Sequence, residues 1–303
     1  MIVIGGATAT GKSALGVEVA KRVDGEIIGA DSMQIYRYMN IGTAKPTVEE
    51  KGGIVHHMID IVEPDASYSV AEYKKQATEI IEDVKKRGKV PVIVGGTGLY
   101  INSLLYDYSP FASDAALRKK LGEECELNGA DYMHEKLCSI DPKAGEVIHK
   151  NNVKRVLRAL EVKILTGESL VGKCDRDFSV PALTYVLGGG DRESLYEKIN
   201  LRVKKMFENG LEEEVSGLLR DKKVTFGCQS MQAIGYKEFR PYFDGESTIE
   251  EVTDKIMQHT RNYAKRQITW FKSIETAIWL QEGTIEEKAD RIAGDYYGFF
   301  CRL

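Results

Sequence analysis

The sequence predicts an α/β fold: a mainly parallel sheet flanked by helices, with an all-helical subdomain inserted into it. Three observations indicate this fold. A phosphate-binding motif lies between an apolar segment and a helical pattern, apolar β-rich segments recur with helical patterns between them, and one connection between strands is far too long, its excess residues being helical in pattern. The chain has 303 residues, 43% of them hydrophobic and 29% charged, which is enough to bury a core and form more than one lobe.

The phosphate-binding motif is GATATGKS, residues 6–13, which fits the P-loop pattern G-x-x-x-x-G-K-[ST]. Apolar residues 2–4 predict a buried strand before it, and residues 13–22 predict a helix after it, the order found in P-loop NTPase-like folds. Backbone N–H groups and the helix N-terminus attract phosphate, Lys12 adds a positive charge, and the Ser13 hydroxyl is a ligand for Mg²⁺. The motif does not specify the molecule that carries the phosphate, for which ATP is the default. The predicted phosphate-binding residues are Gly6, Ala7, Thr8, Ala9, Thr10, Gly11, Lys12 and Ser13.

The remaining β-rich segments predict a doubly wound sheet. Residues 69–87 have helical periodicity, with Ser69 as the N-cap and Gly88 as the C-terminal stop. Strands that alternate with helices form a largely parallel sheet, in which ligands bind at the carboxyl ends of the strands. The loops after the first three candidate strands should therefore converge. The candidate strands are residues 1–5, 26–30, 90–95, 183–188 and 277–280.

The connection between residues 97 and 183 is much longer than an ordinary crossover between parallel strands. It contains three candidate helices, residues 115–127, 131–140 and 152–166, and little strand signal. We therefore expect two parts. Residues 1–112 and 180–303 form the α/β core with the catalytic channel, and residues 113–179 form the helical insertion.

Two polar residues are expected beside the phosphate loop. Asp31 follows the candidate strand EIIGA, where a carboxylate could bind Mg²⁺, serve as a general base or simply cap a turn. The sequence has no convincing second acidic strand end, which favours the general base over the Mg²⁺ ligand. Thr97 in GGTGLY could hydrogen-bond a substrate or only stabilise a turn.

The histidines and cysteines favour structural roles. His56 and His57 are adjacent, and neighbouring side chains on an extended chain point to opposite faces, so a shared metal ion is disfavoured. The five cysteines are scattered without a C-x-x-C pair, which indicates reduced thiols in a cytoplasmic protein. No apolar segment is long enough to cross a membrane. The cysteines are Cys125, Cys138, Cys174, Cys228 and Cys301.

The formal net charge of −4 by itself argues weakly against a nucleic-acid partner, but local clusters of Lys and Arg matter more than the sum. Residues 151–162 separate an apolar stripe from a basic face, and that face is either solvated or contacts phosphates. Residues 260–271 repeat the pattern and end in two aromatic residues, which we expect in the core. Arg202, on a third basic helix, could bind phosphate oxygens through two hydrogen bonds. The basic face of residues 151–162 carries Lys154, Arg155 and Arg158.

Several segments together resemble one family, the bacterial tRNA dimethylallyltransferases, also called tRNA isopentenyltransferases. Small departures occur at Tyr38 and Asn40, where the family pattern suggests Gly and Asp, and at Val55, where Pro often stands. The segments that carry the resemblance are GGATATGKS (5–13), ADSMQIYRYMNIGTAKP (30–46), HHMIDIVEP (56–64), VGGTGLY (94–100), NNVKRVLRALEV (151–162), LYEKINLRVKKM (195–206), QAIGYKE (232–238) and KRQITWF (265–271).

The resemblance implies a reaction. The loop would hold the diphosphate of dimethylallyl diphosphate, and the N6 amine of the adenosine immediately 3′ of the tRNA anticodon would attack the allylic carbon. Asp31 would be the general base, and Thr97 would contact the adenosine. Lys12, Arg202 and a Mg²⁺ ion on Ser13 would stabilise the departing diphosphate.

The resemblance also implies an RNA surface. The helical insertion would grip the anticodon stem-loop, and a monomer with no membrane association is expected. The implied RNA-binding residues are Asp31, Ser32, Met33, Gln34, Thr97, Arg118, Lys154, Arg155, Arg158, Gln232, Gly235, Tyr236 and Lys237.

Three other functions stay open from the residues alone. A prenyltransferase acting on free adenine nucleotides would not need a helical insertion with a basic face. A P-loop small-molecule kinase would need lid arginines and a second acidic strand end. A non-catalytic nucleic-acid-binding protein would have no need of Asp31 and Thr97 beside the loop.

Overall fold

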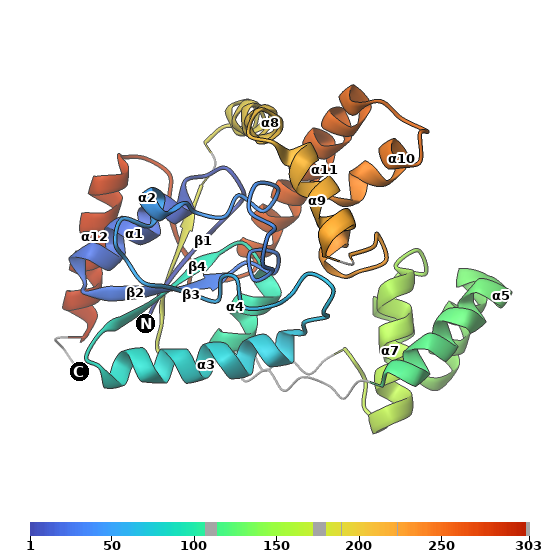
Figure 1. Ribbon diagram of the computed structural model, residues 1–303. Helices are drawn as coiled ribbons and strands as arrows, with labels where there is room; N and C mark the ends of the chain where they lie inside the picture. The colour runs from blue at the N-terminus through green and yellow to red at the C-terminus, as the bar shows by residue number, and fades with distance from the viewer. Residues whose placement is uncertain (107–113, 172–179, 189, 223, 301–303) are drawn as a thin grey trace. The chain divides into compact units, whose positions relative to one another are not determined.

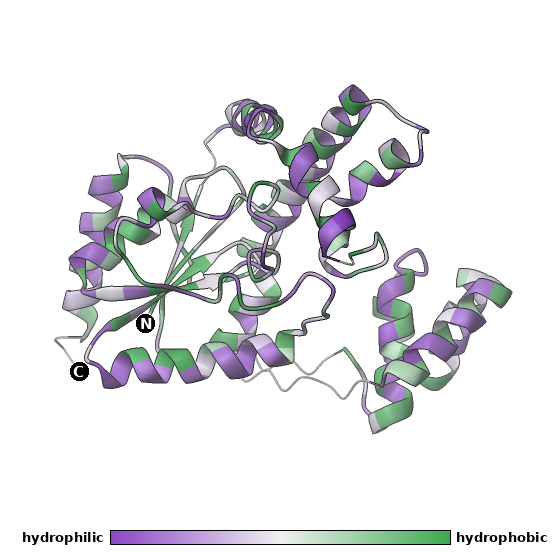
Figure 2. Ribbon diagram, viewed as in Figure 1, coloured by the Kyte–Doolittle hydropathy of each residue, from purple (hydrophilic) through white to green (hydrophobic). Residues whose placement is uncertain are grey.

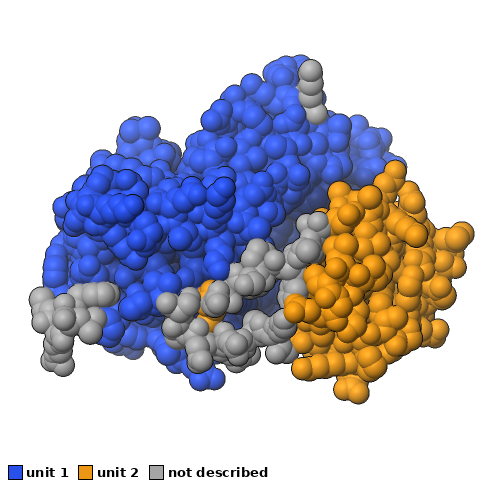
Figure 3. All heavy atoms as spheres, turned by 90° about the horizontal axis from the view of Figure 1, so that it is seen from below, with its two compact units in different colours: residues 1–105, 180–303 blue, residues 106–179 orange. Residues whose placement is uncertain are grey.

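The computed structural model describes residues 1–106, 114–171, 180–188, 190–222 and 224–300 (Figure 1). The chain divides into two compact units, which Figure 3 distinguishes by colour. Unit 1 consists of residues 1–105 and 180–303, and unit 2 consists of residues 106–179. Unit 2 includes the expected insertion of residues 113–179.

Unit 1 is built on a parallel sheet, which in the described residues has six strands in the order β3-β2-β4-β1-β5-β6. The predicted strands form at nearly their expected positions, and all pairings are parallel. The two-residue strand β3 was not predicted, because it is too short to show periodicity. The strands are β1 (Ile2–Gly6), β2 (Gly25–Ala30), β3 (His56–His57), β4 (Val90–Gly95), β5 (Leu183–Leu187) and β6 (Ile278–Leu280).

Helices cover both faces of this sheet. Figure 1 shows α1 and α12 side by side on one face and α3 on the other. Ser69 caps α3 through a reciprocal capping box with Glu72, as its sequence predicts. In Figure 2 hydrophobic and hydrophilic residues alternate along α3, which buries one side of the helix against the sheet. The helices are α1 (Lys12–Arg22), α2 (Val48–Lys51), α3 (Val70–Lys86), α4 (Gly98–Leu105), α8 (Arg192–Glu208), α9 (Leu211–Asp221), α10 (Arg240–Phe243), α11 (Ile249–Phe271) and α12 (Ile285–Phe300).

The sheet brings three loops to one edge. In the parallel register Gly5 of β1 lies opposite Gly95 of β4, and Gly95 lies opposite Ala30 of β2. The chain continues from these strand ends into the phosphate loop, Asp31 and Gly96. The predicted convergence of the three loops is therefore confirmed.

Unit 2 is helical in its described residues. It contains α5 (Ala115–Ile140), α6 (Pro142–Val147) and α7 (Val153–Thr166). Gly129 interrupts α5 with a φ of 84°, which is why the sequence predicts two separate helices there. Leu121, Met133 and Leu137 of α5 pack with Val156 and Leu160 of α7 in a core of their own.

Candidate active site

The phosphate loop connects β1 to α1 in the predicted way. Ala9 and Gly11 have φ angles of 62° and 87°, which let successive backbone amides turn toward one side. Gly11 is the N-cap of α1, and no side chain caps this helix, so its first N–H groups remain available to an anion. Thr10 Oγ1 donates a hydrogen bond to the carbonyl of Ala7 at 2.8 Å, which stabilises the turn.

Two cations and one carboxylate share the space above this loop. Arg202 of α8 donates a hydrogen bond from Nη1 to Thr8 Oγ1 at 3.4 Å. Burial lowers the pKa of Lys12 to about 8; the positive charge of Arg202 contributes, and the negative charge of Asp31 opposes the shift. Burial also lowers the pKa of Arg202, again against the effect of Asp31. The excess of positive charge favours binding of an anion at this position.

Asp31 lies directly after β2 and faces the same space. Its Oδ1 accepts hydrogen bonds from the N–H groups of Met33 at 2.9 Å and Gln34 at 3.4 Å. This is the turn that the sequence offered as an alternative role. Its Oδ2 has no hydrogen-bond partner among the described residues, so the turn leaves one carboxylate oxygen free to accept a proton.

Thr97 supports the loop that follows Asp31. Its Oγ1 accepts a hydrogen bond from the N–H of Ser32 at 3.0 Å and lies 3.4 Å from Ser32 Oγ. The residue does not line the cavity described below, whereas Ser32 does. The structure therefore shows Thr97 as a support of the turn, and its contact with a substrate stays a prediction.

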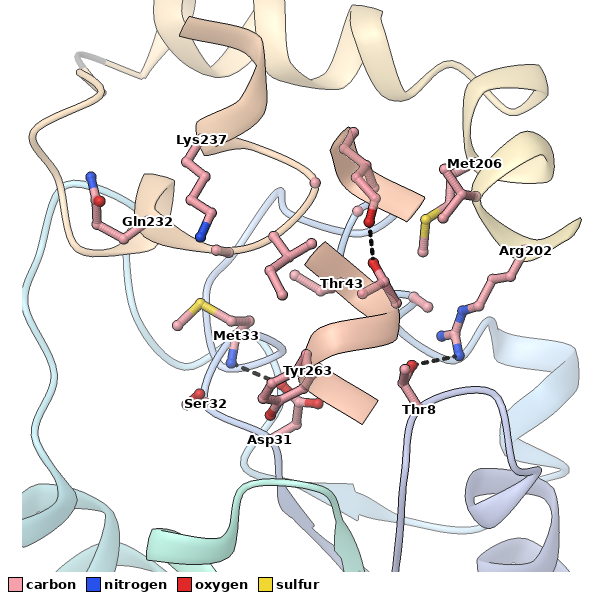
Figure 4. Close-up of a pocket in the computed structure, with 18 of the residues that line it drawn as sticks. Thr8, Asp31, Ser32, Met33, Thr43, Arg202, Met206, Gln232, Lys237 and Tyr263 are labelled. Atoms are coloured by element: carbon pink, nitrogen blue, oxygen red, sulfur yellow. Dashed lines mark hydrogen bonds between the residues drawn. The ribbon is translucent and has the colours of Figure 1, made fainter. Parts of the chain in front are cut away.

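A cavity of about 290 Å³ opens beside these residues (Figure 4). Thr8 and Arg202 lie at one side of it and Asp31 at another, while residues 232–235 and Lys237 form a further wall. Eight predicted site residues line it: Thr8, Asp31, Ser32, Met33, Arg202, Gln232, Gly235 and Lys237. The lining residues that the sequence did not assign to the site include Thr43, Met206, Ile256, Thr260 and Tyr263, and also Arg266, which was expected only on a basic helix face.

Tyr263 of α11 is the most informative of the missed residues. Burial and the negative charge of Asp31 raise the pKa of its phenol to about 12, although hydrogen bonds with Thr97 and Gln267 oppose the shift. The phenol therefore stays protonated at neutral pH and can donate a hydrogen bond into the cavity. The periodicity of residues 260–271 indicated a basic helix face, and no local signal marked Tyr263.

The comparisons with known proteins identify the family. The family model for IPP transferase matches residues 34–274. This chain belongs to the IPP transferase family. It is 49% identical over 286 residues to the tRNA dimethylallyltransferase of Caldanaerobacter subterraneus subsp. tengcongensis, covering 92% of this chain and 90% of that protein.

Solved structures show the same family fold. A tRNA isopentenylpyrophosphate transferase from Staphylococcus epidermidis is 45% identical, with 98% of each chain covered and a TM-score of 0.73. A eukaryotic dimethylallyltransferase acting on tRNA is 30% identical, with 93% of this chain and 73% of that chain covered and a TM-score of 0.80. The predicted family and fold are confirmed, and the chain is a prenyltransferase by family.

Two residues that are predicted to bind RNA make hydrogen bonds within the protein. Gln34 Nε2 donates hydrogen bonds to the carbonyls of Thr43 and Ala44, both at 3.1 Å. Tyr236 is fully buried, and its phenol donates to Glu214 at 2.6 Å. Burial leaves the Tyr236 side chain a supporting role in this structure, and its predicted RNA contact stays a prediction.

The basic residues of unit 2 fall into two groups. Arg118 and Arg158 both donate to Glu161, whose side chain is only 1% exposed. Lys154 and Arg155 are exposed at the start of α7. Of these four cations, two thus share a buried carboxylate, and two are exposed with no ion-pair partner among the described residues; their contact with RNA stays a prediction.

The histidines are structural, as predicted. His56 Nδ1 lies 2.9 Å from the carbonyl of Ile54, and His57 Nε2 lies 2.7 Å from Glu26 Oε2. No group of His, Cys, Asp and Glu in the described residues could hold a metal ion.

No helix in the described part of the chain is long and apolar enough to cross a membrane. Cys125, Cys138 and Cys228 are free, and Cys174 and Cys301 lie outside the described residues.

The departure from the family pattern at Tyr38 has a conformational consequence. Its φ is 66°, in the left-handed region where Gly is free of the Cβ clash. The ammonium of Lys222 lies 3.9 Å from the centre of the Tyr38 ring, so a cation–π contact partly offsets the backbone strain.

Proposed function

We propose that this protein transfers the dimethylallyl group of dimethylallyl diphosphate to the N6 amine of the adenosine immediately 3′ of the anticodon in tRNA, releasing diphosphate. One observation carries the proposal: a phosphate loop and a free carboxylate oxygen face the same cavity of about 290 Å³. The phosphate loop can bind the diphosphate of a prenyl donor, and the carboxylate oxygen can accept the proton of the amine nucleophile. The names of the relatives and solved structures support this choice of substrates.

The leaving diphosphate gains negative charge as the bond from carbon to oxygen breaks. The loop amides, Lys12 and Arg202 already present positive charge there, so they stabilise the charge that develops. The Ser13 hydroxyl at the start of α1 is exposed and makes no hydrogen bond with the described residues, so it fits a Mg²⁺ ion that would also bind diphosphate oxygens. Bound there, Mg²⁺ supplies Lewis-acid assistance to the leaving group.

The attacking amine is a poor nucleophile because its lone pair is delocalised into the adenine ring. Asp31 orients the amine through Oδ2 and accepts its proton as the bond to carbon forms. The Met33 and Gln34 amides hold Oδ1, so they fix the direction in which Oδ2 points. Tyr263 and Ser32 line the wall beside Asp31 and supply hydrogen bonds for the adenine.

The acceptor is an unpaired base of the anticodon loop, which leaves its stack at a cost of a few kcal/mol. Gln232 and Lys237 contact the RNA at the cavity, and Lys154 and Arg155 of unit 2 contact the phosphates of the stem. Thr97 contributes to the adenosine site through Ser32. The protein acts in the cytoplasm as a monomer.

A transfer assay tests the proposal. The protein is incubated with Mg²⁺, radiolabelled dimethylallyl diphosphate and unmodified bulk tRNA, with AMP and ATP in parallel tubes. Label in tRNA alone is the expected result. Label in AMP or ATP would support a prenyltransferase of free nucleotides, and consumption of ATP without transfer of label would indicate a kinase.

A further inference from the structure

One buried glutamine joins the phosphate loop to the loop after β4. Gln267 of α11 is 5% exposed. Its Oε1 accepts a hydrogen bond from the N–H of Thr8 at 2.9 Å, and its Nε2 donates to the carbonyl of Gly96 at 3.0 Å. Because Thr8 offers a donor and Gly96 an acceptor, only this orientation of the carboxamide satisfies both groups.

These two contacts join the phosphate loop to the segment that supports the turn after Asp31. Thr8 belongs to the phosphate loop, and its hydroxyl accepts the hydrogen bond from Arg202. Gly96 directly precedes Thr97, and the Thr97 hydroxyl holds the N–H of Ser32, the residue after Asp31. A Cβ at Gly96 would lie 2.2 Å from Gln267 Nε2, so this approach needs glycine.

We propose that Gln267 is a positioning residue that sets the distance between the diphosphate-binding loop and the loop that carries the general base. The inference rests on the proposed function, in which these two loops hold the leaving group and the nucleophile. Gln267 touches neither substrate. It acts through Thr8 on one side and through Gly96, Thr97 and Ser32 on the other, and it also hydrogen-bonds the phenol of Tyr263.

The consequence for the rate follows from the geometry of displacement. Attack on carbon requires the amine and the diphosphate in line on opposite sides of it, and a misplacement of about 1 Å can lower the rate about 100-fold. Each loop still binds its own ligand when the bridge is lost. Loss of Gln267 should therefore lower kcat and leave the KM values for donor and tRNA nearly unchanged.

Gln229, which is exposed, offers a control for the pair of hydrogen bonds. Its Oε1 accepts from the N–H of Tyr68 at 3.1 Å, and its Nε2 donates to the Tyr68 carbonyl at 2.9 Å. Gln229→Met thus removes the same pair of hydrogen bonds away from the phosphate loop. We expect Gln267→Met to lower kcat at least 30-fold with both KM values within 3-fold, and Gln229→Met to leave kcat within 2-fold.

Gln267→Glu supplies a second readout. The ionised carboxylate accepts from Thr8 but repels the Gly96 carbonyl, whereas the protonated acid restores both hydrogen bonds in the same shape. The charged and titratable groups of the surrounding site are Lys12 on α1, Asp31 after β2, Arg202 on α8, and Tyr263 and Arg266 on α11 itself. The activity of Gln267→Glu, divided by the wild-type activity at the same pH, should therefore rise at least 5-fold as the pH is lowered from 8 to 5.5.

Three outcomes would overturn the inference. The first is a raised KM with unchanged kcat in Gln267→Met. The second is a loss of kcat in Gln229→Met as large as that in Gln267→Met. The third is a ratio of Gln267→Glu activity to wild-type activity that does not change with pH. Wild-type enzyme is the baseline, and its failure to label tRNA would count against the proposed function alone. In that case amide hydrogen exchange decides the inference, because Gln267→Met must speed exchange in both residues 6–11 and residues 95–98, and faster exchange in only one segment would refute the bridge.

Discussion

The phenol of Tyr236 donates a 2.6 Å hydrogen bond to Glu214, and this carboxylate also holds the loop that forms one wall of the cavity. Its Oε2 accepts from the N–H groups of Asn40 and Ile41 at 2.7 and 2.8 Å, and its Oε1 accepts from the N–H of Gly42 at 3.1 Å. One side chain of α9 thus orders residues 40–42. The wall of the cavity therefore depends on a residue that contacts no substrate in the proposed function.

Replacing this carboxylate should be costly. Glu214→Ala leaves the buried Tyr236 hydroxyl and three backbone N–H groups without their acceptor, so we expect a loss of about 2–4 kcal/mol in the free energy of unfolding. The neighbouring Glu213→Ala is the control, since Glu213 is exposed, and its change should stay within about 0.5 kcal/mol. Urea unfolding of both variants measures the difference. Equal effects would show that Glu214 does not order the loop.

The two carboxylate oxygens of Asp31 should have separate roles, one in the turn and one as the general base. Asp31→Asn keeps an acceptor for the Met33 and Gln34 amides but removes the base, so transfer to tRNA should fall about 100- to 10,000-fold. The affinity for tRNA should stay within about 2-fold, because the loop is retained. Filter binding and single-turnover transfer measure the two quantities, and Asp31→Ala, which also loses the turn, is the comparison. A large loss of RNA affinity in Asp31→Asn would rule out the role of general base.

The exposed cations of unit 2 should contribute to RNA binding by electrostatics. Replacing Lys154 and Arg155 by Ala should weaken tRNA binding and reduce the slope of log affinity against log salt by about 1–2. Replacing Lys75 and Lys86 of α3, which are also exposed, is the control for the change in net charge. An unchanged slope in the first variant would mean that this face is only solvated.

Stability in acid should depend on Glu26. Its side chain is 3% exposed, and hydrogen bonds from Arg87, followed by that from His57, lower its pKa from 4.5 to about 2 despite burial. A carboxyl whose pKa is lower in the folded state stabilises the protein above pH 4.5, and this contribution is lost as the pH falls from 4.5 toward 2.

The corresponding test compares Glu26→Gln with wild type. At pH 7 the variant should be less stable by about 2 kcal/mol, and the difference should shrink as the pH falls below about 4.5. Glu79→Gln on the exposed face of α3 is the control and should follow wild type. Thermal unfolding between pH 7 and pH 3 measures the trend, and a difference that is constant over this range would contradict it.

Much of the fold was predictable because its signals are local. A continuous apolar segment before a glycine-rich loop predicts β1 and α1, and Ser69 with Glu72 predicts the start of α3. The strand β3 gave no such signal, since two residues show no period and pair only because β2 lies beside them. The kink of α5 at Gly129 likewise appeared as a break between two helices.

The candidate site was predictable in part. Local motifs indicated the phosphate loop, Asp31 and Thr97, and the order of strands and helices predicted that they meet. The roles of Tyr236 and Arg158 were not predictable, because a side chain on a polar segment or a basic helix gives no sign of a buried partner. Glu214, which accepts from Tyr236, lies 22 residues away on α9. Glu161, which accepts from Arg158, lies three residues further along α7, and the helical pattern gave no sign of its burial.

The sequence by itself determined the chemistry at the loop ends: which residues can bind phosphate, accept a proton or begin a helix, since each depends on a few neighbouring residues. Only the tertiary structure decided which side chains meet across the chain. Gln267 reaches Thr8 and Gly96, and Tyr263 lies close enough to Asp31 to feel its charge, because α11 packs against β1 and α4. Contacts between residues far apart in the chain depend on how whole elements pack, and no local pattern records that packing.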